Sequence, residues 1–287
     1  MSMAPHRRCR FARTLLCAAL ASCAAPRSAP GPGLVAVGAR QLWLDCRGRG
    51  SPTLVLEAGH TESAETWAAV QLEVAAFTRV CSYDRAGRGH SPRAPDSVRR
   101  GSDVVADLAE LLSAAGESSP LILLGHSLGG AFARLYVVAH PTSVAGLLLV
   151  DAVHEGEFAR IDALLTPEQR RAGAGMKPMS PEGFDIEAIF GEVRTAAAKT
   201  VSVPVTVVAR GRPLGANEFP PDWSLAQRAE RDTLRQVLQA ELAHSFPQGR
   251  LVVAENSGHF IHHDEPALLV AEIRRLVDAW RRSHGAT

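Results

Sequence analysis

A serine flanked by glycines, in residues 125–129 (GHSLG), is the stretch best suited to covalent chemistry. The residues before it, 121–124, form an apolar run typical of a strand buried on both faces of a parallel sheet. The residues after it carry apolar side chains at helical spacing as far as Ala139. Small neighbours permit the strained backbone of a sharp strand-to-helix turn, which exposes a serine hydroxyl. The pattern therefore predicts that Ser127 is a nucleophile.

A serine hydroxyl needs partners before it can attack a carbonyl group. The backbone N–H of Leu128, at the start of the predicted helix, is a candidate donor for the developing oxyanion. A neutral imidazole must also accept the hydroxyl proton. His259 is the candidate, because it lies in a Ser-Gly-His loop after the last predicted strand. His126 lies inside the turn itself and is expected to point elsewhere.

A second group of polar residues, His262, His263 and Asp264, follows closely in the sequence. These side chains could ligate a metal ion, and the alternative is that they start the last helix or face solvent. We favour the second interpretation, so the sequence predicts neither a metal site nor a bound cofactor.

Strands and helices alternate along the chain. The expected strands are two within residues 34–46, then 53–57, 79–83, 121–124, 146–150, 203–209 and 250–254. The expected helices span residues 65–77, about 102–115, the stretch after residue 129, 224–244 and 266–282. Residues 152–199 contain short helical segments with Pro and Gly interruptions and no strand, which is typical of an inserted lid. The order predicts an α/β fold: a mostly parallel central sheet with helices on both faces.

Composition sets broad limits on function. The chain has 287 residues and a formal net charge of +1, with acidic and basic residues interspersed. No basic patch of the kind that binds nucleic acid is evident. The length suits one large α/β domain or two small ones.

The first thirty-odd residues have the features of a bacterial export signal. Residues 6–13 are basic and residues 14–21 are apolar, but too few to span a membrane. The sequence before Cys23 resembles a lipobox, which predicts that Cys23 is lipidated and anchors the protein to a membrane. Cleavage near Ala24 or Ala25, which would release a soluble protein, is the alternative. We therefore take residues 1–33 as signal and tether and residues 34–287 as the domain.

Export changes the expectation for the cysteines. Cys46 and Cys81 remain in the folded part, and an oxidising compartment allows a disulfide between them if their strands are neighbours. Two buried free thiols are the alternative.

With these motifs in order, the chain resembles the α/β-hydrolase fold superfamily from about residue 34 to the C-terminal helix. The matching stretches are LVLEAGH, VCSYDRAGRGHSP, LLGHSLGGAFA, LLLVDA and ENSGHF. The resemblance implies the order nucleophile, acid, histidine, which Ser127, Asp151 and His259 keep. It also implies that the backbone N–H of His60, after the 53–57 strand, is the second oxyanion donor.

The acid is the open question of this resemblance. Many members of the superfamily carry it after the strand that here is 203–209, but that strand is followed by an Arg-Gly-Arg-Pro stretch and no carboxylate before Glu218 and Asp222. Asp151, at the end of the preceding strand, is preferred because a strand end is rigid. The alternatives are that Asp222 is the acid, or that Asp151 caps the lid or pairs with an arginine.

The resemblance implies an exported serine hydrolase that cleaves carboxylic esters of small molecules. Amidase, lactonase, C–C hydrolase and cofactor-free haloperoxidase chemistry remain alternatives, as does a non-catalytic binding protein. Several apolar residues between 153 and 199 could roof an acyl pocket or simply pack the lid: Phe158, Leu164, Leu165, Phe184, Ile186, Ile189 and Phe190.

Overall fold

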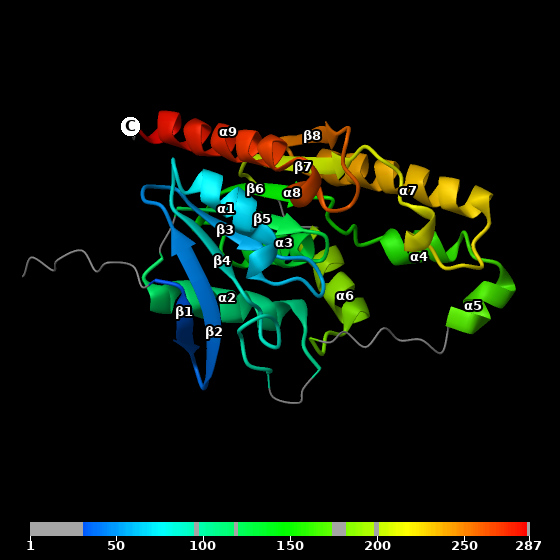
Figure 1. Cartoon of the computed structure of the whole chain (residues 1–287), viewed down its shortest axis with the longest axis horizontal. Helices are drawn as coiled ribbons and strands as arrows, with labels where there is room; N and C mark the ends of the chain where they lie inside the picture. Colours follow the sequence, from blue (N-terminus) through cyan, green and yellow to red (C-terminus); the bar gives the residue numbers. More distant parts are fainter. Residues whose placement is uncertain (1–30, 95–97, 118–119, 174–181, 198–200, 286–287) are drawn as a thin grey trace, which may run out of the picture.

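A central sheet organises the molecule (Figure 1). The computed structural model describes residues 31–94, 98–117, 120–173, 182–197 and 201–285. Its eight strands are arranged in the order β1-β2-β4-β3-β5-β6-β7-β8. The strands are β1 (Gly33–Val37), β2 (Arg40–Arg47), β3 (Thr53–Glu57), β4 (Val80–Tyr83), β5 (Leu121–His126), β6 (Val144–Val150), β7 (Val205–Arg210) and β8 (Gly249–Ala254). Pairing is antiparallel for β1 with β2 and for β2 with β4, and parallel from β4 to β8, so the prediction of a mostly parallel sheet is confirmed.

Helices cover both faces of the sheet, as predicted. Their bounds are η1 (Ala64–Trp67), α1 (Ala68–Val74), α2 (Gly101–Ala115), α3 (Gly129–Ala139), α4 (Glu157–Asp162), α5 (Pro167–Gly173), α6 (Ile186–Ala197), η2 (Ala216–Glu218), α7 (Leu225–His244), α8 (Ile261–Asp264) and α9 (Pro266–His284). In Figure 1, α9 runs along one side of the sheet with α1, and α2 lies on the other side.

Strand β5 illustrates why both faces must be covered. All six of its residues are buried. Leu121 and Leu123 belong to the apolar core under α2 and α3, whereas Ile122 and Leu124 belong to the core under α1 and α9. Successive strand residues point to opposite faces, so an unbroken apolar run requires a layer of helices on each side.

Two helix starts differ from the sequence prediction. The helix expected from about residue 102 begins at Gly101, because the Asp103 carboxylate accepts a hydrogen bond from the Arg100 N–H at 2.8 Å and sets Arg100 as the N-cap. The helix expected over residues 65–77 is instead a 3₁₀ turn, η1, followed by the short α1. Both still bury an apolar face, including Trp67 of η1 and Val70 and Val74 of α1, whereas Leu72 is exposed.

The segment between β6 and β7 contains α4, α5 and α6; α4 packs against α7, whereas α6 packs against α3 and α2 (Figure 1). Between residues 152 and 197, the described part forms no strand, only a single bridge between Arg99 and Phe184. Within this segment Ile189, Phe190 and Phe184 are buried, whereas Phe158 is exposed. The structure thus shows a helical insertion, and its action as a lid stays a prediction.

The two cysteines of the folded part form a disulfide, as predicted. Cys46 and Cys81 face each other directly across the antiparallel pair β2 and β4 and are bonded, with Cα atoms 4.0 Å apart. The bond joins β2 to the strand that enters the turn beside the site.

The export signal predicted within residues 1–30, including Cys23, lies outside the described residues. Among the helices that the structure does describe, none is long and apolar enough to cross a membrane.

Candidate active site

Ser127 occupies a strained turn between β5 and α3. Its φ is +51°, a left-handed value that a residue with a side chain seldom adopts. A Cβ at Gly125 would lie 2.5 Å from the Gly129 carbonyl oxygen, and a Cβ at Gly129 would lie 2.5 Å from that of Ala58. Both positions therefore require glycine, and the strain falls on Ser127 as the sequence predicted.

The close approach of Gly129 to Ala58 also places the loop after β3 against the first turn of α3. Backbone N–H groups in the first turn of a helix have no partner within the helix, and Leu128 is the N-cap of α3. His60 follows Gly59 in the β3 loop and is half-buried, and burial lowers the pKa of its imidazole. The two predicted oxyanion donors thus belong to neighbouring segments.

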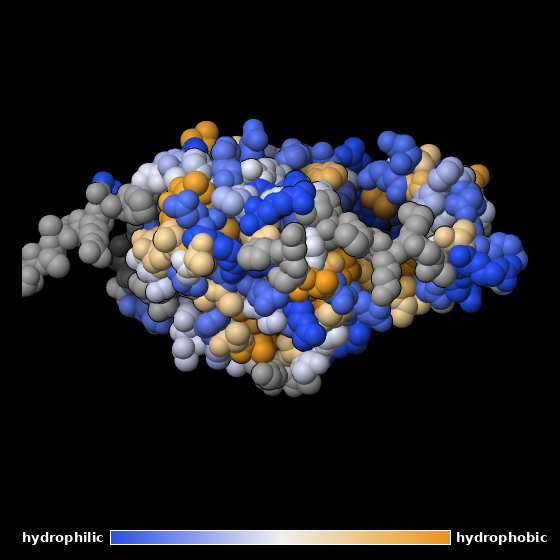
Figure 2. Space-filling view, turned by 90° about the horizontal axis from the view of Figure 1, so that it is seen from below, coloured by the Kyte–Doolittle hydropathy of each residue, from blue (hydrophilic) through white to orange (hydrophobic). Residues whose placement is uncertain are grey.

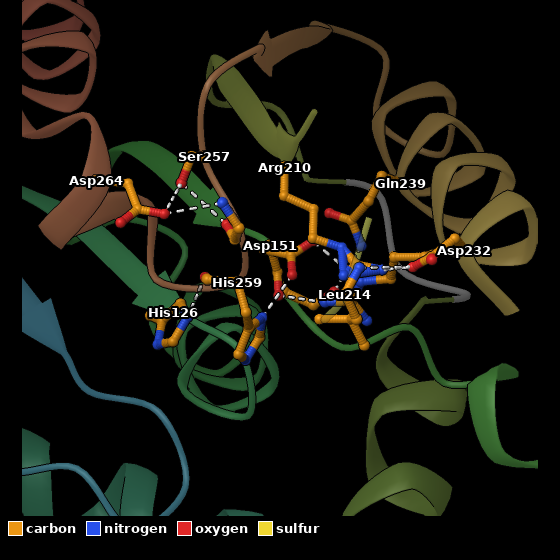
Figure 3. A network of polar contacts seen from close by, with 12 residues as sticks. His126, Asp151, Arg210, Leu214, Asp232, Gln239, Ser257, His259 and Asp264 are labelled. Atoms are coloured by element: carbon orange, nitrogen blue, oxygen red, sulfur yellow. Dashed lines mark hydrogen bonds and ion pairs between the residues drawn. The ribbon is translucent and has the colours of Figure 1, made fainter. Parts of the chain in front are cut away.

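Asp151 and His259 meet at the carboxyl edge of the sheet (Figure 3). The Oδ2 atom of Asp151 lies 2.5 Å from Nδ1 of His259. Asp151 directly follows β6, with a φ of +34°, and its backbone N–H donates to the Val208 carbonyl at 2.7 Å. Because Nδ1 of His259 faces the carboxylate, its Nε2 is the nitrogen left to accept a proton from a nucleophile.

An arginine of α7 fixes the orientation of Asp151. The Arg235 Nε donates to Asp151 Oδ1 at 3.0 Å, and its Nη1 donates to Glu157 at 2.6 Å. Burial alone raises the pKa of the Asp151 carboxyl, but the Arg235 charge and the hydrogen bond with His259 outweigh it and hold that pKa well below its usual range. Asp151 is therefore ionised in the folded protein at neutral pH. The sequence had left a pairing with an arginine as the alternative role of Asp151. The structure shows that Asp151 contacts Arg235 and His259 at the same time.

Burial lowers the pKa of His259, although the hydrogen bond and the charge of Asp151 oppose the shift. The His259 side chain keeps 27% of its surface exposed, whereas Asp151 keeps 1%. The imidazole is therefore neutral at pH 7 and accessible from the solvent side, which are the requirements for a general base.

The alternative acid, Asp222, is exposed in the loop before α7, and its backbone carbonyl accepts a hydrogen bond from Gln169 of α5 at 3.0 Å. The end of β7 carries Arg210 instead of an acid. Its guanidinium is buried and donates to Asp232 of α7 at 2.6 Å (Figure 3). The structure thus brings Asp151, and not Asp222, to His259.

The predicted cluster of His262, His263 and Asp264 does not converge on one point. Asp264 accepts hydrogen bonds from the Gly258 N–H at 2.9 Å and from Arg212 at 2.7 Å. His262 and His263 point the other way, toward the hydroxyl of Thr66. They were expected to start the last helix or face solvent; instead they form a separate short helix, α8, before α9, and His262 is buried. The His/Glu group that does converge is Glu62, His126 and His262, whose ligand-type atoms lie within 4.8 Å of one another.

The site also contains a buried arginine, Arg85, whose contacts the sequence did not predict. The Arg85 guanidinium donates to the backbone carbonyls of Ala58 at 2.6 Å and Gly59 at 2.7 Å. It also pairs with Glu57 and Glu182, both at 2.7 Å. Arg85 therefore holds the loop after β3 by its carbonyl groups. The Asp-Arg-Ala-Gly stretch after β4 was the available signal, but it did not reveal this contact.

Aromatic side chains link the helical insertion to α3 and its own helices to one another. Phe132 of α3 packs against Phe184, with ring centroids 5.3 Å apart, and Phe158 packs against Phe190 of α6 at 4.8 Å. Figure 2, seen from below, shows hydrophobic residues gathered near the middle of this face among hydrophilic ones. Phe158 is 51% exposed, so this aromatic packing reaches the surface of the insertion.

These features define a member of the α/β hydrolases. The chain belongs to the alpha/beta hydrolase family, whose profile matches residues 54–273. It is 26% identical over 236 residues to the uncharacterized protein YqjL of Bacillus subtilis, which covers 82% of this chain and 85% of YqjL.

Solved structures share the fold at low identity. The enol-lactonase of Burkholderia xenovorans LB400 superposes with a TM-score of 0.58 at 17% identity, covering 86% of this chain and 100% of that one. A thermophilic esterase of Thermogutta terrifontis gives a TM-score of 0.58 at 20% identity, covering 88% and 99%. The predicted superfamily is therefore confirmed, whereas the bond that is cleaved differs among proteins of this fold.

Proposed function

We propose that the protein is an exported serine hydrolase that cleaves carboxylic esters of small molecules through an acyl-enzyme on Ser127. The observation that carries the proposal is the pairing of a strained Ser127 turn with the contact between Asp151 and His259. Backbone strain at Ser127 costs folding free energy, and strain of this kind clusters at functional sites. A carboxylate that orients an imidazole is the arrangement that activates a serine for acyl transfer.

In the proposed reaction, Nε2 of His259 takes the proton of the Ser127 hydroxyl as Oγ attacks the ester carbonyl carbon. The carbonyl oxygen becomes an oxyanion, which the N–H groups of Leu128 and His60 stabilise. When the C–O bond of the ester breaks, His259 returns the proton to the leaving alcohol. A water molecule then gives a proton to His259 as its oxygen attacks the acyl carbon. When the bond to Oγ breaks, His259 returns that proton to Oγ, which releases the carboxylic acid and regenerates Ser127.

Asp151 supports both transfers. Its ionised carboxylate keeps the proton on Nδ1 of His259 and stabilises the imidazolium that forms during each attack. Because Arg235 holds the second carboxylate oxygen, the ring orientation is set before substrate binds.

The test is hydrolysis of p-nitrophenyl esters from acetate to palmitate by the purified domain and by Ser127→Ala, with fluorophosphonate labelling of both. We expect turnover with a chain-length optimum, and loss of turnover and labelling in the variant. Labelling at Ser127 without ester turnover would indicate that the substrate is an amide or a lactone and not a simple ester. Labelling that persists in Ser127→Ala would remove Ser127 as the nucleophile.

Export and lipidation through Cys23 are part of the proposal and rest on the sequence alone. The full chain expressed in a bacterial host should incorporate radiolabelled palmitate, and Cys23→Ser should not. Equal labelling of the two would assign the modification elsewhere, and no labelling of either would favour cleavage near Ala24 and a soluble form.

A further inference from the structure

The carboxylate of Glu62 lies where three segments of the site meet. Glu62 belongs to the loop between β3 and η1, and its side chain keeps 12% of its surface exposed. Its Oε2 accepts a hydrogen bond from the Gly59 N–H at 2.6 Å and lies 2.6 Å from Nδ1 of His126. Its Oε1 accepts from the Thr66 hydroxyl at 2.9 Å and lies 3.2 Å from Nε2 of His262. Both oxygens therefore have two polar partners.

His126 extends these contacts to the catalytic-histidine loop. Its Nε2 lies 3.0 Å from the backbone carbonyl oxygen of His259. The rings of the two histidines also pack, with centroids 4.6 Å apart. A continuous chain of hydrogen bonds thus runs from Gly59, through Glu62 and His126, to His259.

The partners of His126 indicate why a charged carboxylate is needed. A carbonyl oxygen faces Nε2 and a carboxylate oxygen faces Nδ1, so each ring nitrogen must donate an N–H. A neutral imidazole carries one N–H only, whereas an imidazolium carries two. The Glu62 carboxylate, at 2.6 Å, and the His259 carbonyl, at 3.0 Å, are the two acceptors that hold this buried ring.

The other groups around Glu62 are consistent with an ionised carboxylate. Burial alone raises the pKa of Glu62, but its hydrogen bonds with His126 and His262 and their charges lower it well below the usual range. Burial lowers the pKa of His262 to about 4, so this ring is neutral at pH 7; its Nε2 lies 2.8 Å from the Thr66 hydroxyl and 3.2 Å from Glu62 Oε1. His263 is exposed; its Nε2 lies 3.1 Å from the Thr66 hydroxyl, and its ring packs against that of His262 with centroids 4.3 Å apart.

The same three side chains have the composition of a metal site, but their geometry indicates hydrogen bonding. The 2.6 Å between Glu62 and His126 is the length of a charge-assisted hydrogen bond and leaves no room for an ion between the two atoms. The backbone N–H of Gly59 already holds the same carboxylate oxygen.

We propose that Glu62 is a positioning residue of the hydrolytic site, whose carboxylate ties the loop that carries His60 to the loop that carries His259. The inference rests on the proposed function, because it gives Glu62 a part in that reaction. Displacement of a reacting group by about 1 Å can cost about 100-fold in rate. Loss of the Glu62 carboxylate loosens the oxyanion loop and the general base together.

The test compares Glu62→Gln with wild type and with Glu117→Gln as a matched control. Glu117 is a similarly buried carboxylate, 9% exposed, paired with Arg79 at the amino end of β4, opposite the site. For Glu62→Gln we expect kcat for the best p-nitrophenyl ester to fall about 10- to 100-fold, with KM changed less than about 3-fold. Fluorophosphonate labelling of Ser127 should slow in proportion, and Glu117→Gln should keep the wild-type kcat.

A double-mutant cycle with His126→Asn separates positioning from general loss of structure. Because Glu62 and His126 act in one chain of contacts, the double variant should be no slower than the slower single variant. Additive losses, or an unchanged kcat in Glu62→Gln, would overturn the inference. So would about one equivalent of zinc in the purified wild-type protein that is lost in Glu62→Gln, because the carboxylate would then be a metal ligand.

The outcome for Ser127 keeps the two proposals distinct. If Ser127→Ala abolishes turnover and Glu62→Gln does not affect it, the positioning inference fails and the hydrolase stands. If Ser127→Ala retains turnover and labelling, the proposed function fails whatever Glu62→Gln does.

Discussion

The Asp151 carboxylate and the His259 imidazole lie 2.5 Å apart although 108 positions separate them in the chain. Each is held from a second side: Asp151 by Arg235 of α7, and His259 at its backbone carbonyl by His126. The contact is therefore braced by two buried polar partners, and its geometry does not depend on substrate.

Replacing Asp151 by asparagine should reduce kcat by about 10³- to 10⁴-fold, because an amide cannot hold the His259 tautomer or stabilise the imidazolium. The measurement is p-nitrophenyl ester turnover beside a thermal melt, since Arg235 loses one of its partners. Asp222→Asn is the control and should match wild type. A large loss in the Asp222 variant with a small one in Asp151→Asn would assign the acid to Asp222.

The pH dependence of kcat/KM should follow the protonation of His259. Only the neutral ring accepts the serine proton, so activity is present above the pKa of His259 and is lost as the pH falls through it. Burial lowers that pKa from its ordinary value of 6.5, so the midpoint of the acidic limb should lie below 6.5. A pH–rate profile with the midpoint above 7 would contradict this sign.

Replacing Arg85 by methionine should lower the free energy of unfolding by about 3–5 kcal/mol, because it leaves the buried carboxylates of Glu57 and Glu182 without their cation. Chemical denaturation measures the change. Arg171→Met removes a pair whose side chains are 71% and 74% exposed, and it should cost less than about 0.5 kcal/mol. If the two substitutions lowered the free energy of unfolding equally, burial would not be the reason that the Arg85 ion pairs stabilise the fold.

The disulfide between Cys46 and Cys81 closes a segment of 35 residues. Removing a link of this span raises the entropy of the unfolded chain, so the double alanine variant should lose about 3–4 kcal/mol of unfolding free energy. Urea denaturation of the wild type with dithiothreitol should approach the variant, and the variant itself should not respond to the reductant. A wild type that is insensitive to reductant would indicate that the link contributes little to stability.

Much of the fold follows from patterns that act over short distances. The apolar runs of β3, β5 and β6 are each long enough for one buried strand, and the helix predicted to end at about residue 115 does end there, at Gly116 with a φ of +74°. Helix starts were less well determined. The start of α2 depends on the Asp103 side chain and the Arg100 N–H, a local choice among several polar residues that the sequence left open.

The contacts of the site required more than local patterns. Glu62 and Arg85 are ordinary loop residues in the sequence, yet the structure buries both, with carbonyl, amide and imidazole partners from distant segments. His126 was expected to point away from the site and instead contacts the His259 carbonyl. A polar side chain in a loop gains its role from what packs on it, and sequence spacing does not encode that packing.

By itself the sequence determined the order of strands and helices, the strained turn at Ser127 and the positions of Asp151 and His259 at strand ends, because backbone sterics and apolar periodicity act on neighbouring residues. Only the tertiary structure decided which carboxylate contacts His259. Strand order places β6 beside β5 and the loop after β8 over Asp151, while Asp222 stays exposed before α7. Distances between residues 108 positions apart depend on how the whole sheet packs, and no local pattern contains them.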